Sequence, residues 1–136
     1  MRYHVKDSIL EGGLVQWTLE ERDIPLFATQ MLLARILVGK VADKERLIHL
    51  LRSVPVVQGD KSWTCVSWVK HALESLRADG RALGTSKVDW DTVGDAAIKY
   101  CQEKKDQGRY DVSRPEVFDM KKAATFDLLE GRETIP

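Results

Sequence analysis

The spacing of apolar residues changes once along this chain, near residue 42, and that change constrains the fold more than any other feature. Before it, apolar and polar residues alternate over residues 2–6 and 14–20, as in strands with one buried face. After it, apolar residues recur every three or four positions from Lys44 onward, as in helices that pack on a core. Strands followed by helices predict an α+β fold, in which a small antiparallel sheet from the N-terminal half packs on helices.

Turn and capping residues divide these regions into elements. Glu11-Gly12-Gly13 is a turn signal, so the first two strands are predicted to form a hairpin. The dense apolar run from 31 to 41 predicts a buried strand, although a short helix can have the same composition. Three helices follow, each after a capping residue: 44 to about 53 after Asp43, Cys65 to about Gly80 after Ser62 or Thr64, and one that begins after Asp89 and continues past Cys101.

The domain organisation is predicted from length and from where the pattern fades. A chain of 136 residues, 43% hydrophobic and 31% charged, suits one globular domain. From Arg109 onward the apolar residues are scattered and Pro115 interrupts them. Residues 1–108 are therefore predicted to form a single domain, and residues 109–136 an extended tail packed on it, with a short helix near 120–124 as an alternative for part of the tail.

Composition argues against several classes of function. The formal net charge is zero, so no excess of basic residues indicates binding to nucleic acid. No apolar run approaches the roughly 20 residues that span a bilayer. Two cysteines, Cys65 and Cys101, make neither a disulfide framework nor a metal-ligand cluster. A reduced, cytoplasmic protein without metal or cofactor is the expectation.

Cys65 is the residue that most directly suggests chemistry. A thiol in the first turn of a helix lies where free backbone N–H groups and the helix dipole favour the thiolate, the form that acts as a nucleophile. The alternative is a small buried thiol, since free cysteine is often found in protein cores. The helical face that begins at Cys65 is predicted to meet the core through Cys65, Val69, Ala72, Leu73 and Leu76.

A base for Cys65 would have to be one of three histidines. The chain has no asparagine, so a Cys-His-Asn triad cannot form. His71 lies about 240° round the same helix from Cys65, and His49 belongs to another helix. His4, in the first strand, is the remaining candidate, and Glu20 and Glu21 could either form an acid pair or orient it. A structural histidine and a solvated strand end are the alternatives.

A pocket beside the Cys65 helix is also conceivable. The candidate lining residues are Trp17, Glu20, Trp63 and Trp68. Tryptophans at such spacings commonly form core instead, so both interpretations stay open.

These residues carry a resemblance to a known group of proteins. Strands with a histidine, followed by a helix that opens on a cysteine, resemble the circularly permuted papain-like cysteine proteins, the group of lecithin-retinol acyltransferase. The run Thr64-Cys65-Val66-Ser67-Trp68-Val69 is similar to the motif at the helix start of that group. Thr64 stands in the place of its asparagine, and Ser67 in the place of its histidine. The resemblance implies a permuted papain-like fold with Cys65 as the nucleophile.

A closer likeness is to a set of uncharacterised fungal proteins. They share a Tyr-His-Val strand, here Tyr3-His4-Val5, and a Cys-x-x-Trp-Val helix, here 65–69. They also share a Trp…Glu-Glu-Arg-Asp segment, here 17–23, and a Val-Pro-Val-Val connector, here 54–57. This likeness covers nearly the whole chain but implies no particular activity.

The papain-like resemblance also implies that this chain lacks one strand, the one that carries the catalytic base in the permuted group. Tyr3-His4-Val5 looks like the second histidine strand of the permuted group, where the base is carried by an earlier strand. Residues 2–6 would then form a bare sheet edge, which a second copy of the chain or the C-terminal tail is expected to cover.

Two functions of different classes follow. The favoured one is a non-catalytic or degenerate papain-like domain that serves as a binding or scaffold module. The alternative is a thiol hydrolase or acyltransferase, in which Cys65 attacks an acyl or amide carbonyl and His4 takes the thiol proton.

Overall fold

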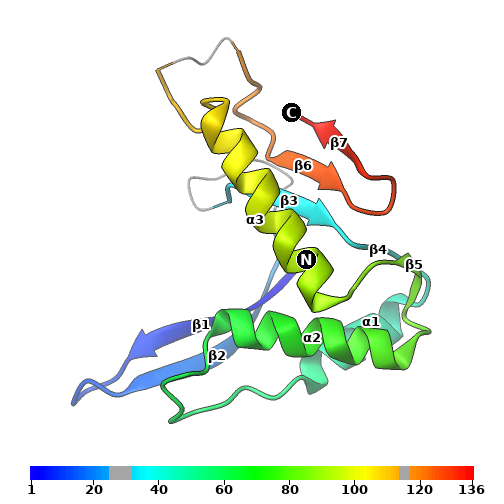
Figure 1. The fold of residues 1–136 in the computed structure, drawn as a ribbon. Coiled ribbons are helices and arrows are strands. Elements are labelled where there is room, and N and C mark those ends of the chain that lie inside the picture. The colour runs from blue at the N-terminus through cyan, green and yellow to red at the C-terminus, as the bar shows by residue number, and fades with distance from the viewer. Residues whose placement is uncertain (25–31, 114–116) are drawn as a thin grey trace. The chain divides into compact units, whose positions relative to one another are not determined.

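The structure is a computed structural model that describes residues 1–24, 32–113 and 117–136. Three helices and several short strands confirm the predicted α+β class (Figure 1). In chain order the elements are β1 (Arg2–Ile9), β2 (Val15–Arg22), β3 (Ala34–Leu37), β4 (Gly39–Val41), α1 (Lys44–Ser53), α2 (Cys65–Asp79), β5 (Leu83–Ser86), α3 (Trp90–Asp106), β6 (Ala124–Asp127) and β7 (Arg132–Ile135).

These elements group into two compact units. Unit 1 comprises Met1–Ile24 and Val41–Gly84, and so holds β1, β2, α1 and α2. Unit 2 comprises Pro25–Lys40 and Thr85–Pro136, and holds β3, α3, β6 and β7. The division falls within β4 and β5.

The predicted N-terminal hairpin is confirmed. β1 and β2 pair antiparallel over their whole length, from Arg2 opposite Arg22 to Ile9 opposite Val15. The turn between them places Gly12 at φ 86° and Gly13 at φ 78°, a region that favours glycine because it has no Cβ. The Gly-Gly signal therefore determined where the hairpin turns.

The three predicted helices are also confirmed, and their caps explain their limits. The Asp43 side chain accepts a hydrogen bond from the Arg46 N–H at the start of α1. Asp89 does the same for the Thr92 N–H at the start of α3. Helix α2 ends where Gly80 adopts φ 65°. These local signals can be recognised within a few residues of sequence.

The buried face of α2 differs in part from the prediction. Ala72, Leu73 and Leu76 are buried as expected, but Cys65 is exposed and Val69 is 42% exposed. The residue that replaces them in the core is Trp68, only 3% exposed. The helical periodicity correctly predicted which side of the C-terminal half of α2 is buried. It cannot show that the first turn of the helix is not covered by other residues.

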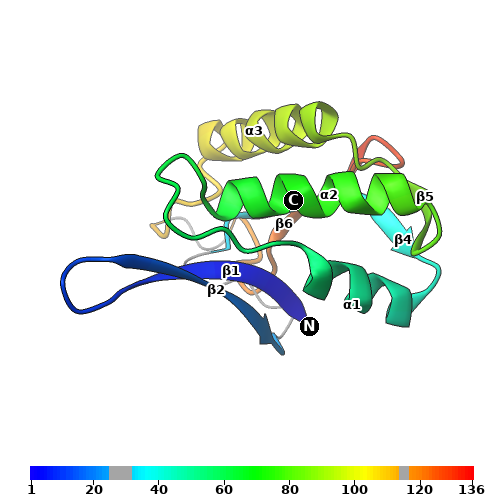
Figure 2. The same cartoon turned by 90° about the horizontal axis from the view of Figure 1, so that it is seen from below.

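Unit 1 has its core between the hairpin and α2. Val5 from β1 packs with Trp63, Trp68 and Ala72, and Val54 completes the cluster. Around this cluster lie half-buried apolar side chains from the hairpin, from α1 and from the connector after it: Tyr3, Trp17, Leu19, Leu51, Val56 and Val57. Figure 2 shows α1 and α2 beside the hairpin.

Unit 2 is built on a sheet that the sequence did not reveal. β3 pairs in parallel with β6, and β6 pairs antiparallel with β7. Helix α3 packs against β3 (Figure 1). The segment after residue 109, predicted to be an extended tail, therefore supplies two of the three strands, and residues 120–124 form no helix.

The β6–β7 hairpin has a local cause that the prediction overlooked. The Asp127 carboxylate accepts hydrogen bonds from the N–H groups of Leu129 and Glu130, at 2.8 and 3.0 Å. Gly131 then adopts φ 68°. This aspartate-to-glycine turn reverses the chain, while Ala123 and Ala124, at most 3% exposed, anchor β6 in the core.

Two further segments depart from the prediction. The run 31–41 is not one strand: β3 and β4 are separated at Val38, whose carbonyl accepts a hydrogen bond from the Lys87 N–H at 2.7 Å. Met31 lies outside the described residues. The predicted loop 81–87 contains β5, which pairs with β4. A strand of small polar residues lacks the alternation by which strands are recognised.

Candidate functional site

The hairpin has two different faces, because side chains alternate along a strand. The odd-numbered residues of β1 and β2, among them Val5, Trp17 and Leu19, pack toward the core of unit 1. The even-numbered residues form a polar face that carries His4 and Glu20. This alternation decides which candidate residues can meet.

His4 lies on the polar face. Its Nε2 is 3.1 Å from Glu20 Oε2, and Glu20 also binds Lys6 Nζ at 2.6 Å. Burial lowers the pKa of His4 below its ordinary value, and the neighbouring cations Arg2, Lys6 and Arg22 act in the same direction, against Glu20. The predicted orientation of His4 by Glu20 is therefore present as a contact.

Cys65 lies on α2, which packs against the other face of the hairpin. It is the first residue of the helix and is exposed. Thr64 and Ser67 form a capping box around it: the Ser67 hydroxyl accepts from the Thr64 N–H at 3.0 Å, and the Thr64 hydroxyl accepts from the Val66 N–H at 3.3 Å. Across the described residues no hydrogen bond joins Cys65 to His4, and the alternation of β1 directs His4 to the face of the hairpin opposite the one against which α2 packs.

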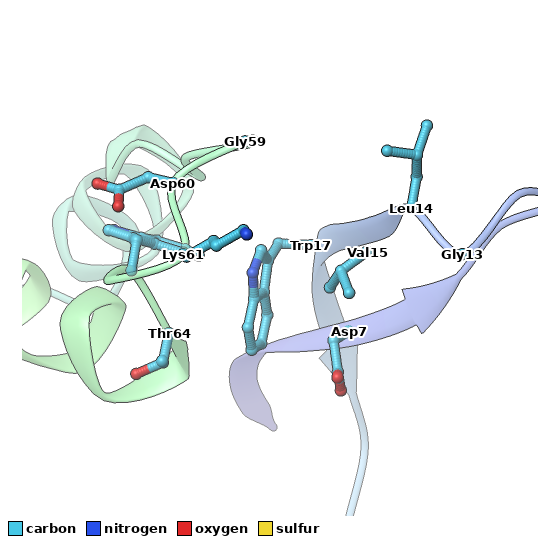
Figure 3. A pocket seen from close by; sticks show the side chains of 10 residues that line it. Asp7, Gly13, Leu14, Val15, Trp17, Gly59, Asp60, Lys61 and Thr64 are labelled. Carbon is cyan, nitrogen blue, oxygen red and sulfur yellow. The ribbon is translucent and has the colours of Figure 1, made fainter.

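A pocket of about 510 Å³ opens on the apolar face of the hairpin (Figure 3). One wall comes from the tip of the hairpin and the other from the loop that leads into α2. The lining residues are Asp7, Gly13, Leu14, Val15, Trp17, Gly59, Asp60, Lys61, Trp63 and Thr64. All of them belong to unit 1.

Two tryptophans form the aromatic part of this pocket. The rings of Trp17 and Trp63 meet edge to face, with centroids 5.6 Å apart and planes 79° apart. Trp63 is only 7% exposed, whereas Trp17 is half-buried. The Lys61 side chain extends toward Trp17, and the Asp60 carboxylate is directed away from it (Figure 3). The pocket therefore offers an aromatic surface with one cation beside it.

One wall of the pocket is held by the Gln58 side chain, which bonds to β2 as the backbone of a neighbouring strand would. The Gln58 carboxamide accepts from the Trp17 N–H at 2.9 Å and donates to the Trp17 carbonyl at 2.7 Å. Immediately after it, Gly59 adopts φ 73° and turns the chain away from β2. The Asp60 carboxylate then binds the Ser62 N–H and hydroxyl at 2.8 and 2.6 Å, and these bonds lower the pKa of Asp60. The turn leaves the space that becomes the pocket.

Of the four residues predicted to line a pocket, two line it and two do not. Trp17 and Trp63 line it together. Glu20 lies on the polar face of the hairpin, and Trp68 is buried in the core of unit 1. Neither of these two is among the lining residues.

Sequence reasoning missed Lys61, which lines the pocket, and Gln58, which binds the backbone of Trp17 beside it. Neither residue carried a signal, because single polar residues in a connector are common. The Gly-Asp-x-Ser run at 59–62 was the available sign, since it is typical of a tight turn. It was not linked to Trp17, which is more than forty residues away in the chain: the two partners of the Gln58 clamp are 41 positions apart.

The remaining candidate residues lie outside this pocket. His49 and His71 are exposed on α1 and α2. Cys101 is half-buried on α3 and is unpaired, as Cys65 is. Within the described ranges no three histidine, cysteine or acidic side chains gather as metal ligands would. No helix in the same ranges combines the length and apolarity that a membrane crossing requires.

Comparison with known proteins identifies a family. The sequence pattern of a family of unknown function, DUF6914, matches residues 1–135. The chain belongs to this family. No curated protein and no solved structure matches it. Membership in DUF6914 agrees with the likeness to an uncharacterised family, and it gives no support to the papain-like resemblance.

Proposed function

We propose that this member of DUF6914 is a non-catalytic binding module, whose pocket between Trp17 and the 59–64 loop holds an apolar group of a protein partner. The observation that carries the proposal is the edge-to-face pair of Trp17 and Trp63 in the lining of an open pocket. A volume near 510 Å³ lies within the range of roughly 300–1,000 Å³ that is typical of ligand sites.

The surroundings of the pocket favour a partner larger than a small solute. Next to it, the hairpin tip exposes a group of aliphatic side chains: Ile9 is 76%, Leu14 69% and Val15 50% exposed. Leu14 and Val15 belong both to this group and to the pocket lining. Contiguous exposed apolar surface is a mark of protein interaction sites. A partner would insert one apolar side chain into the pocket and cover the tip with its neighbours.

The alternative, a thiol hydrolase or acyltransferase, has one observation in its favour. Cys65 is exposed at the first position of a capped helix, where a nucleophile would be accessible. Against it, His4 faces the other side of the hairpin and already contacts Glu20. A degenerate, permuted papain-like domain would keep the cysteine helix and the strands but lack the base. Such a domain would be non-catalytic, as we propose.

Self-association is part of the same proposal. In the described ranges β1 pairs with β2 alone, so its other edge has no strand partner. Unpaired edges are sites where another chain can add a strand. A second copy of this chain pairing there would form a dimer, and two unpaired cysteines agree with a reduced, cytoplasmic location.

A substitution at the pocket mouth tests the binding proposal. The probes are N-acetyl-leucinamide and N-acetyl-tryptophanamide, followed by NMR shifts of the protein's own indole N–H signals. Shifts are expected for Trp17 and Trp63 and not for Trp90, which lies in unit 2. Val15→Lys places a charge in the pocket lining and should weaken probe binding by at least about tenfold, or about 1.4 kcal/mol.

Gln16→Lys is the matched control, because it adds the same charge one residue later but on the polar face. It should leave probe binding unchanged. The proposal fails if neither probe shifts the two indole signals, or if Gln16→Lys weakens binding as much as Val15→Lys does.

A further inference from the structure

The polar face of the hairpin carries a second candidate site, distinct from the pocket. Arg2 of β1 lies directly opposite Arg22 of β2, and His4 lies opposite Glu20. Residues directly opposite in an antiparallel pair have their Cβ atoms about 5 Å apart. Two arginine side chains therefore begin from neighbouring positions at the open end of the hairpin, and His4 follows Arg2 on the same face.

The charges on this face do not balance. The carboxylate on this face is that of Glu20, which lies 2.6 Å from Lys6 and 3.1 Å from His4. In the described part of the chain no carboxylate lies within ion-pair distance of Arg2 or Arg22. With His4 neutral, three cations face one carboxylate, so two positive charges are in excess. Like charges directly opposite each other destabilise a sheet unless something neutralises them.

Two nitrogen atoms on this face also lack partners. Arg2 Nε and His4 Nδ1 are buried, and neither has a hydrogen-bond partner among the described residues. A buried polar group without a partner costs stability, so an unpaired buried donor often marks the position of a bound molecule. The two atoms come from residues on the same side of β1, two positions apart.

We infer that the polar face of the hairpin binds a doubly charged phosphate group between Arg2 and Arg22, with His4 as a third donor. The fork of a guanidinium group matches phosphate oxygens in pairs, which a lysine cannot do. A dianion neutralises the two excess charges, whereas a carboxylate neutralises one. The site faces away from the Trp17 pocket and does not depend on the function proposed for that pocket.

Binding is coupled to a proton on His4. Its Nε2 already faces Glu20, so Nδ1 can donate to a phosphate oxygen only when the ring is protonated. Burial and the cations Arg2, Lys6 and Arg22 lower the pKa of His4 in the unliganded protein, and Glu20 opposes them. A bound phosphate adds negative charge beside the ring and must raise this pKa.

The experiment is an NMR titration of the His4 ring signals in the full chain, once in sodium phosphate and once in sodium chloride of the same ionic strength. Phosphate is expected to shift the His4 titration midpoint upward and to leave those of exposed His49 and His71 unchanged. Equal midpoints for His4 in the two salts would overturn the inference, and this result needs no variant.

Substitutions then test the two arginines. Arg2→Gln and Arg22→Gln should each weaken phosphate binding at least about tenfold, and Arg2→Lys should weaken it less, since it keeps the charge and loses the fork. Arg81→Gln is the matched control, because Arg81 is an exposed arginine outside the hairpin. If Arg81→Gln weakens binding as much as the hairpin variants, the effect is one of net charge and the site is refuted.

A second probe identifies the source of the phosphate. Glycerol 3-phosphate presents the same dianion attached to a larger molecule. Tighter binding of glycerol 3-phosphate than of inorganic phosphate would assign the site to a phosphomonoester. Tighter binding of inorganic phosphate would assign it to the free ion, and absence of binding by both would overturn the inference.

Discussion

The two units of this protein differ in what they bury. Unit 1 buries mostly apolar side chains such as Trp68 and Val5, together with the Asp79 carboxylate, which is 5% exposed and bonded to Arg46, and it leaves an apolar pocket open. Unit 2 buries several charged side chains: Lys104 is 2%, Arg109 3% and Asp127 8% exposed. A paired buried charge already has its partner, whereas an open apolar pocket can accept a ligand. The contrast therefore directs the search for function to the pocket of unit 1.

The buried charges of unit 2 connect its C-terminal hairpin to α3. Glu133 of β7 binds Lys104 Nζ and accepts from the Tyr100 hydroxyl at 2.6 Å. Burial by itself would raise the pKa of Glu133, but the hydrogen bonds from Lys104 and Tyr100 lower it overall. Burial, together with the bond to Glu133, raises the pKa of Tyr100 well above its ordinary range.

Arg109 completes this arrangement through bonds to backbone carbonyls. It donates to the carbonyls of Lys122 at 2.6 Å, Asp119 at 3.2 Å and Pro136 at 3.3 Å. Its guanidinium also lies 5.2 Å from the ring of Phe118. These contacts hold the segment after α3 in place. In unit 2, buried polar contacts therefore add to the apolar packing of residues such as Ala124 and Leu128.

The largest effect is expected from removing the central tryptophan of unit 1. Trp68→Ala should lower the free energy of unfolding of unit 1 by about 3–5 kcal/mol, because it leaves a large cavity in the core. Urea unfolding followed by amide signals from each unit measures the effect. Val69→Ala, at the next position but 42% exposed, is the control and should change stability by no more than about 0.5 kcal/mol. Equal effects of the two variants would show that the buried face of α2 is misassigned.

A somewhat smaller effect is expected from breaking the buried pair in unit 2. Glu133→Ala leaves Lys104 buried without its counter-ion and should cost about 3 kcal/mol in urea unfolding of unit 2. Adding Lys104→Met should recover much of that loss, since the uncompensated charge is then gone.

Glu130→Ala provides the control for the same hairpin. Glu130 pairs with Arg132 at 2.5 Å on the surface, where a salt bridge contributes at most about 1 kcal/mol. If Glu130→Ala were as destabilising as Glu133→Ala, burial of the Lys104 pair would not be the cause, and the contrast between the units would lose its basis.

The smallest effect concerns the two cysteines, one in each unit. Cys65 is exposed and Cys101 half-buried, so iodoacetamide should label Cys65 faster. His4→Ala should change the Cys65 rate by less than about twofold, because a general base would contribute about 100-fold or more. Mass spectrometry of the labelled peptides measures both rates, with Cys101 as the internal reference. A large drop at Cys65 alone would revive the thiol-enzyme proposal.

Much of unit 1 could be predicted from sequence, for a physical reason. The β1–β2 hairpin, the caps Asp43 and Thr64, and the end of α2 at Gly80 all depend on groups within a few residues of one another. Hydroxyl and carboxylate caps, and glycine at positive φ, act on the neighbouring backbone wherever the rest of the chain lies. Such signals can be recognised in the sequence without knowledge of the fold.

The tertiary structure decided the rest. Nothing local shows that Ile36 pairs with Phe126, that Gln58 clamps Trp17, or that Lys104 is buried against Glu133. Each of these contacts joins residues far apart in the chain, and its free energy depends on what else has already been brought together. The sequence by itself determined the helices, the first hairpin and its two faces. Only packing decided that the first turn of α2 is exposed, that the C-terminal segment becomes a sheet, and that a pocket opens where Gly59 turns the chain away from β2.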